Sequence, residues 1–409
     1  MLVMRLRDPR LIIALAVAAC LFAALALLDF VPEAEYTHQV LFTVPWGTEP
    51  GALGLARGAD GVLYGPRSFA LHGDLIYVAD TFNARVQAFT PDGEVAAIIP
   101  LQEMPAAGHH PLAVFAAAGP EDQTHSLQAG DPWINDLTVD GRGRLYLADS
   151  SGPRILLVDA DGTFLEAIDV SAAAPVPAAD GAEAPDEPVW LLERVALDGR
   201  GLVYLAHTYL SDQVFARSLV RFEPGEDRFV HLAGASLREG GAMEPSPGSL
   251  LPSPANSFAL AGDDALYVED RGADPFARHV RLYGRGRRLR REWVVRHRQA
   301  VLGASLLGTD RFHHGYLLIN GGGQEAAVVR LEEDQAEAVP VIAGLPWPGS
   351  VAANIYGRVD SGGSVYLAVP GADGWRLEKW QATWRRHIRW SARRPAGWRQ
   401  PAENTIRQG

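Results

Sequence analysis

Residues 76–89 read IYVADTFNARVQAF: an apolar strand ending in an acid, a short polar turn, and a second apolar strand. The first strand, with its tyrosine, returns as LYLAD at residues 145–149, where RILLV at 154–158 supplies the second strand. Looser copies of the tyrosine strand occur at residues 203–207, 266–270, 315–318 and 365–368. Self-similar strand units recurring every few dozen residues are typical of blade-like repeats. The chain is therefore predicted to contain about six related β units.

The composition agrees with an all-β chain. Its 409 residues include 42 glycines and 28 prolines, which fall at short intervals between apolar runs. Turns such as Asp140-Gly141 and Asp198-Gly199 separate the first two strands of a unit, and Asp-Gly pairs accept the backbone angles of tight hairpins. With 47% hydrophobic residues the chain can bury a large core.

The opening motif also carries a family resemblance. Asp80 to Val86 resembles the Asp-x-x-Asn-x-Arg-Val core of an NHL repeat, and Asp92-Gly93 matches the turn that follows it. The resemblance implies a six-bladed β-propeller of the NHL or TolB-like type over residues 38–391. His207 replaces the aspartate in the third copy, and the fifth and sixth copies lack the motif. The residues to which the resemblance gives a structural role are Asp80, Asn83, Arg85, Asp149 and Arg154.

Ring closure is predicted from a second similarity. Residues 40–46 read VLFTVPW, and residues 341–347 read VIAGLPW. The later stretch is expected to be the fourth strand of a blade. The earlier one would then complete the last blade from the N-terminal end, which removes an exposed sheet edge. A chance recurrence of Pro-Trp before loops is the alternative.

The N-terminus is predicted to anchor the chain in a bacterial cell membrane. Residues 11–28 (Leu11 to Leu28) contain no charge or proline and are long enough to cross a bilayer as one helix. Three arginines precede them, which places residues 1–10 in the cytoplasm and the propeller outside. Residues 29–37 are expected to be a linker and 392–409 a disordered tail. Two alternatives to this retained single-pass anchor stay open: cleavage after Ala26, and lipidation of Cys20, which ends a lipobox-like stretch.

Charge and cysteine content exclude some classes of function. The formal net charge of −12 gives no basis for broad nucleic-acid binding. Cys20 is the one cysteine of the chain, so the predicted propeller has no internal disulfide and no cysteine-ligated metal.

Polar side chains are expected to converge where the innermost strands begin, at the mouth of the central channel. Oxygen-rich groups there could hold a divalent cation or a polar ligand, although any propeller has polar residues hydrating its channel. Six-bladed lactonases of the gluconolactonase type use such a cluster. Alignment of the first four units brings together these candidate ligand-binding residues: Arg67, Asn135, Asp136, Glu193, Arg194 and Asn256, with Ser68 and Ser257 at the equivalent of Asp136.

Long insertions are expected on the face of that mouth, at residues 102–133, 171–190 and 234–254. Long loops on one face of a rigid scaffold are where binding usually occurs. The sequence therefore favours a membrane-tethered extracytoplasmic scaffold that binds a protein or polymeric ligand on this loop-rich face, without a cofactor. A metal-dependent lactonase or hydrolase with its site at the channel mouth is the alternative.

Overall fold

The computed structural model describes residues 28–57, 63–102, 104–105, 131–173, 189–210, 214–238, 244–245, 249–251, 256–262, 265–321, 325–346 and 356–390. These residues form strands and a few short 3-10 helices. The chain divides into two compact units, Thr37–Gln381 and, separately, Met1–Tyr36 with Ala382–Gly409. In the second unit Arg385 forms an ion pair with Glu35 at 2.9 Å. The first unit contains the repeats.

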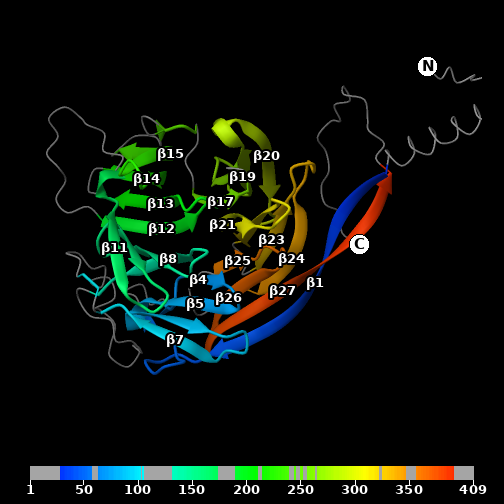
Figure 1. Ribbon diagram of the computed structural model, residues 1–409. Coiled ribbons are helices and arrows are strands. Elements are labelled where there is room, and N and C mark those ends of the chain that lie inside the picture. The colour runs from blue at the N-terminus through cyan, green and yellow to red at the C-terminus, as the bar shows by residue number, and fades with distance from the viewer. Residues whose placement is uncertain are drawn as a thin grey trace, which may run out of the picture. The chain divides into compact units, whose positions relative to one another are not determined.

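Six antiparallel sheets make up the blades (Figure 1). Blade one is β4 (Phe69–His72), β5 (Leu75–Asp80), β6 (Arg85–Phe89) and β7 (Val95–Pro100), and blade two is β8 (Ile134–Val139), β9 (Leu145–Asp149), β10 (Arg154–Val158) and β11 (Phe164–Asp169). Blade three is β12 (Val189–Leu197), β13 (Val203–Leu210), β14 (Val214–Glu223), β15 (Arg228–Arg238) and β16 (Glu244–Pro245). Blade four is β17 (Ser257–Ala261), β18 (Ala265–Asp270), β19 (Ala277–Tyr283) and β20 (Leu289–Arg296). Blade five is β21 (Val301–Thr309), β22 (Gly315–Gly321), β23 (Glu325–Leu331) and β24 (Val339–Pro346). Blade six is β25 (Tyr356–Val359), β26 (Val365–Gly371), β27 (Gly374–Trp390) and β1 (Leu28–Val44).

The six first strands line the axis of the ring. Each of β4, β8, β12, β17, β21 and β25 contacts the next, and β25 returns to β4. Short elements lie between the blades and at turns: β2 (Ala56–Arg57), β3 (Leu63–Tyr64), η1 (Thr81–Asn83), η4 (Ser171–Ala173) and η5 (Arg285–Arg287). The predicted six-bladed, all-β propeller is confirmed.

Blade six closes the ring with strands from both ends of the chain. Its strand order is β1-β27-β26-β25, so the N-terminal strand takes the outermost position, as the repeated Pro-Trp stretch predicts. Phe42 on β1 packs on Phe89 of blade one and Trp375 of blade six, with ring centroids 5.6 and 6.4 Å apart. Burying these aromatic rings joins the first blade to the last.

Each repeated tyrosine lies in the second strand of its blade, and apolar side chains pack between neighbouring blades. One such cluster joins Ala79 and Val86 of blade one to Leu137 and Leu147 of blade two. Tyr267 of blade four is fully buried and donates its hydroxyl to the His313 carbonyl of blade five at 2.9 Å. The core is therefore a series of inter-blade layers.

Several predicted segments have other structures or lie outside the described residues. Strand β1 takes in residues 29–37, which were expected to be a linker. Part of the insertion at 234–254 extends β15 and adds β16 to blade three as a fifth strand. Most of the insertions at 102–133 and 171–190, the predicted anchor before Leu28, with Cys20, and the predicted tail lie outside the described residues. Within the described part of the chain no helix is long and apolar enough to span a bilayer.

In blade one, the NHL-like motif is a buried network around one carboxylate. Asp80 is fully buried, and its Oδ2 accepts hydrogen bonds from Arg85 Nε at 2.7 Å, Asn83 Nδ2 at 2.9 Å and Gln87 Nε2 at 3.0 Å. Its Oδ1 accepts the backbone N–H of Gly54 at 2.7 Å. The motif therefore attaches the chain entering the blade to the blade's second and third strands.

Blade two has the same kind of buried carboxylate network, with a different set of hydrogen-bond donors. Asp149 accepts Arg154 Nε at 2.8 Å, the backbone N–H of Trp133 at 2.8 Å and the Ser151 hydroxyl at 2.6 Å. Ser151 thus supplies a side-chain donor where the first copy uses Asn83. The aspartate and the arginine are the constant parts of the motif.

Blade three replaces the buried ion pair by a buried histidine. His207 lies at the position of Asp80, is 1% exposed, and contacts Trp190 in a tilted arrangement with ring centroids 5.3 Å apart. Neither ring nitrogen has a hydrogen-bond partner among the described residues. Burial, with a smaller contribution from His231, lowers the pKa of His207 to about 3. The imidazole is therefore neutral in the folded protein at neutral pH.

This histidine should make the fold sensitive to acid. The unfolded chain binds a proton at His207 below about pH 6.5, whereas the folded chain does so only near pH 3. The stabilisation that comes from keeping His207 neutral is therefore complete above pH 6.5, and it is lost as the pH falls from 6.5 toward 3. Between pH 7 and 5 the loss should be about 2 kcal/mol. Urea unfolding at both pH values should show a smaller pH-dependent loss in His207→Leu, and equal losses would contradict the prediction.

Candidate functional site

The sequence-predicted site residues lie at the axis, on the face where the innermost strands begin, here called the mouth face. They form two layers. The outer layer contains Arg67, Asn135, Glu193 and Asn256, and the inner layer contains Asp136 and Arg194. Arg67 contacts Asn135 directly, whereas Glu193 and Asn256 are connected through Arg217, which the alignment did not include.

β-bulges explain why the side chains of two consecutive residues on one strand both point toward the axis. In a regular strand, Asn135 and Asp136 would point to opposite faces. The pairing of β8 with β9 is interrupted by a bulge between Ile134 and Asp136, and β12 has the same feature between Leu192 and Arg194. The extra residue is Asn135 in one strand and Glu193 in the other. Bulges re-aim side chains in this way.

In the outer layer, Arg67 and Asn135 join blades one and two. Arg67 donates Nη1–H to Asn135 Oδ1 at 2.7 Å, and Trp133 Nε1–H donates to the same oxygen at 3.0 Å. Asn135 Nδ2 donates to Ser150 Oγ at 2.5 Å, and Ser150 Oγ accepts the backbone N–H of Leu192 at 2.9 Å. Asn135 is buried and fully engaged, while Arg67 stays partly exposed.

The other half of the outer layer centres on Arg217 of β14. Its Nη1–H donates to Asn256 Oδ1 at 2.7 Å, and its Nη2 lies 3.5 Å from Glu193 Oε1. Glu193 Oε1 also accepts the Thr208 hydroxyl at 2.9 Å. Arg217 and Glu193 side chains are 33% and 30% exposed, so solvent reaches both. This group presents a guanidinium and amide edge to any ligand at the mouth.

The inner layer is organised by Asp136. Its Oδ1 accepts the Ser68 hydroxyl and Arg358 Nη2–H, and its Oδ2 accepts the backbone N–H of Val195 at 2.9 Å. Arg358 also donates to Ser68 Oγ at 2.9 Å. These partners belong to blades one, six and three, while Asp136 itself belongs to blade two. One carboxylate therefore joins four blades.

Arg194 of blade three contacts blades four and five. It donates Nη1–H to the Leu306 carbonyl and Nη2–H to the Leu307 carbonyl of β21, the latter at 3.2 Å. Its guanidinium carbon lies 5.8 Å from the ring centre of Phe258 in blade four. Burial, and then the nearby Arg358, lower the pKa of Arg194 to about 9, so it remains a cation at neutral pH.

The alignment missed two arginines that complete the site. Arg217 lies on a third strand, which the alignment of innermost strands did not cover. Arg358 lies on β25 of blade six, where the NHL-like motif has disappeared from the sequence. Extending the alignment to the sixth unit would not have found Arg358, because Arg358 pairs with Tyr366 as Thr138 pairs with Tyr146, and is therefore equivalent to Thr138 and not to Asp136. Nothing in the local sequence of β14 singles out Arg217.

A further acid lies beside the axis but away from solvent. Glu269 of β18 is 1% exposed, accepts the Ser257 hydroxyl at 3.4 Å and lies 3.5 Å from Arg278 Nε. Burial raises the pKa of Glu269 to about 8 in spite of the arginine. An accessible carboxyl with this pKa would suit general acid catalysis, but the side chain cannot reach a ligand in this position.

The donor set at the mouth does not fit a divalent cation. Such a cation needs several oxygen ligands with free lone pairs. Glu193 and Asp136 belong to separate networks, and each has an arginine beside one of its two oxygen atoms. Across the described part of the chain, no cluster of three or more His, Cys, Asp or Glu side chains could hold a metal. The charge of the mouth favours an anion.

No family model and no curated protein matches the chain. Among solved structures, it is similar to a gluconolactonase from Xanthomonas campestris, with 13% identity over 85% of this chain and 100% of that one, at a TM-score of 0.43. A streptogramin B lyase shows 8% identity over 85% and 98%, at a TM-score of 0.44. YCF48 bound to D1 peptide shows 10% identity over 86% and 99%, at a TM-score of 0.40.

Proposed function

We propose that this protein is a membrane-tethered extracytoplasmic propeller that binds a protein or polymeric ligand through its mouth face and does not catalyse a reaction. The observation that carries the proposal is the pair of partly exposed arginines at the mouth: Arg67 lies beside the neutral amide of Asn135, and Arg217, which pairs with Glu193 at 3.5 Å, keeps 33% of its side chain exposed. A rigid closed ring holds these donors in place, which lowers the entropic cost of binding.

The chemistry of the donors indicates the ligand. A guanidinium presents several N–H groups in a planar fork that matches a carboxylate. Arg67 uses part of that fork on the Asn135 oxygen and keeps partial access to solvent. Arg217 donates to Asn256 and also to Thr208 and Glu193, and its side chain is 33% exposed. We therefore propose an acidic segment of a protein, or an anionic polymer, as the ligand.

The lactonase alternative is less well supported by the same contacts. Metal-assisted hydrolysis requires carboxylates that converge on a cation, whereas Glu193 is occupied by Arg217 and Thr208. Added Ca²⁺, Mg²⁺ or Zn²⁺ is expected to leave the melting temperature unchanged. A stoichiometric metal, or lactone hydrolysis lost in Glu193→Ala, would instead support the enzyme.

The tether remains part of the proposal. It is supported by the uncharged stretch at residues 11–28 and by the arginines before it. Protease added to intact spheroplasts should digest the propeller, and protection from the protease would contradict its placement outside the membrane.

Loss of both mouth arginines should strongly reduce ligand capture. We expect photo-crosslinking from a residue beside Arg67, in membranes of the native host, to yield a defined partner. Arg67→Ala combined with Arg217→Ala should reduce that yield by at least about tenfold, since two charge-assisted contacts are removed. Arg142→Ala, an exposed arginine at the opposite end of blade two, is the matched control and should retain the partner. Equal yields from both variants would refute the role of the mouth.

A further inference from the structure

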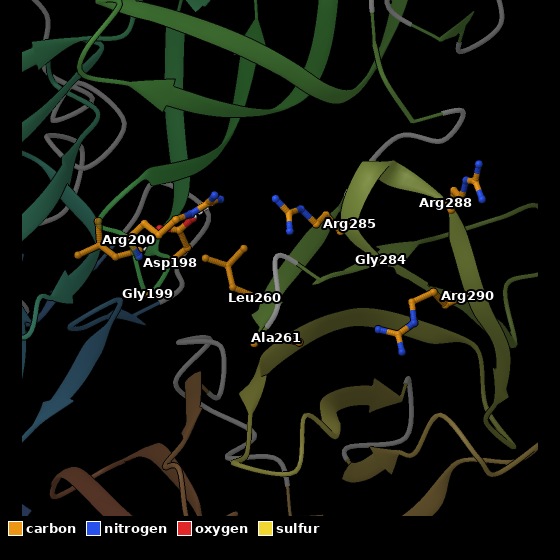
Figure 2. Close-up of a pocket in the computed structure, with 11 residues that line it drawn as sticks. Asp198, Gly199, Arg200, Leu260, Ala261, Gly284, Arg285, Arg288 and Arg290 are labelled. Atoms are coloured by element: carbon orange, nitrogen blue, oxygen red, sulfur yellow. Dashed lines mark hydrogen bonds and ion pairs between the residues drawn. The ribbon is translucent and has the colours of Figure 1, made fainter.

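A cavity lies on the face of the propeller opposite the mouth, between blades three and four. Its volume is about 810 Å³, within the range of small-molecule sites. The walls are the β12–β13 turn at Asp198 to Arg200, the end of β17 at Leu260 to Gly262, and the β19–β20 turn with the start of β20, from Gly284 to Arg290 (Figure 2). The mouth arginines do not line it.

The cavity is basic in a chain of net charge −12. Four arginines line it, Arg200, Arg285, Arg288 and Arg290, against one carboxylate, Asp198. Asp198 pairs with Arg200 at 3.3 Å, and Glu333 pairs with Arg290 at 2.8 Å. Figure 2 shows Arg285 and Arg200 extending toward each other from the two sides of the cavity. Like charges that face each other are stabilised by an anion between them.

The turn that carries Arg285 and Arg288 has a defined shape. Arg287 N–H donates to the Gly284 carbonyl at 3.0 Å, and Gly284 N–H donates to the Arg288 carbonyl at 2.9 Å. Gly286 and Arg287 both adopt positive φ, at 75° and 61°. This local geometry, rather than a regular hairpin, places two arginines of one turn on the same cavity.

The rest of the lining is apolar. Leu197, Leu260 and Ala261 contribute to the cavity wall, and Leu260 stands between the basic walls in Figure 2. A fully hydrated inorganic anion would leave this apolar surface uncovered. A ligand with a small apolar group attached to the anion would bury it and gain free energy in proportion to the area covered.

We propose that this cavity binds an amphipathic oxyanion, the phosphate or sulfate ester of a small apolar group. The oxyanion lies between Arg285 and Arg200, and the apolar group lies over Leu260 and Ala261. The ester is either a free small molecule or the headgroup region of an anionic lipid, and both share this chemistry. The site is independent of the mouth and of its proposed function.

The test is calorimetric titration of the full-length chain, in neutral detergent, with phenyl phosphate and with inorganic phosphate. Phenyl phosphate should bind at least about tenfold more tightly, because its ring buries apolar surface. Arg285→Ala should weaken phenyl phosphate binding by about tenfold or more. Absence of binding at millimolar concentrations, or equal affinity for the two probes, would overturn the proposal.

Arg291→Ala is the matched control, because Arg291 follows the same turn and does not line the cavity. It should change the affinity by less than about twofold, since Arg291 is half-buried outside the cavity and its loss removes no contact to a ligand there. If Arg291→Ala weakens binding as much as Arg285→Ala, the anion is held by the overall positive charge of this region and not by the cavity residues, which would refute the site. The double variant Arg67→Ala with Arg217→Ala should bind phenyl phosphate normally, which separates this test from that of the mouth.

Phosphatidylglycerol vesicles that displace phenyl phosphate would identify a lipid as the source of the ester, and vesicles that do not would identify a soluble one.

Discussion

Replacing Asp136 by alanine should lower the free energy of unfolding by about 3–5 kcal/mol, the cost of removing one partner from a buried ion pair. The Asp136 side chain is 4% exposed and that of its partner Arg358 is 19% exposed. Without the carboxylate, Arg358 and the nearby Arg194 remain as two cations near the axis. The Ser68 hydroxyl and the backbone N–H of Val195 lose an acceptor as well.

The large effect follows from the place of Asp136 in the ring. Its contacts connect blades one, two, three and six, so its loss weakens several blade interfaces at once. Urea unfolding followed by tryptophan fluorescence would measure the change. Asp161→Ala in the same blade removes a fully exposed carboxylate and should have little effect. A loss for Asp136→Ala no larger than that of Asp161→Ala would show that the axial network does not hold the ring together.

Asp80→Ala is expected to have a comparable cost, again about 3–5 kcal/mol. The carboxylate is fully buried and accepts four hydrogen bonds, from Gly54, Asn83, Arg85 and Gln87. Alanine would leave the Gly54 and Arg85 Nε N–H groups without their acceptor, whereas Asn83 and Gln87 would each keep one backbone carbonyl as acceptor. Because Gly54 precedes blade one, the variant should also loosen the connection from β1 into the ring.

The control for this second prediction is Asp92→Ala, which removes an exposed aspartate from the β6–β7 turn of the same blade. Its effect should stay within about 0.5 kcal/mol. Thermal melting and urea unfolding should rank the two variants in the same order. If Asp80→Ala costs less than about 1 kcal/mol, the NHL-like motif has no structural role in this chain.

Local sequence was sufficient to predict the architecture. The apolar strand with its tyrosine and the Asp-Gly turns define each blade within a few dozen residues, because strand alternation and turn geometry depend on near neighbours. The strand bounds Arg85–Phe89, Leu145–Asp149 and Arg154–Val158 agree with β6, β9 and β10. Closure of blade six by β1 was also predictable, because the same Pro-Trp stretch occurs at both ends.

The candidate site was only partly predictable from the sequence. Repeat alignment predicts that Arg67, Asn135, Glu193 and Asn256 lie together at the mouth, since equivalent positions in a ring face a common axis. It does not show that bulges in β8 and β12 turn adjacent residues toward that axis. A bulge depends on the register with the partner strand, which one strand's sequence does not contain.

The partners of the axial charges were decided by tertiary structure. Asp136 and Arg358 lie 222 positions apart in the chain and meet only because the ring closes. The basic cavity likewise combines turns of two blades, so Arg200 and Arg285 share it without any sequence pattern that links them. What repeats within a blade was determined by the sequence itself. What lies between blades was determined by closure, because electrostatic and hydrogen-bond partners depend on distance in space and not on distance along the chain.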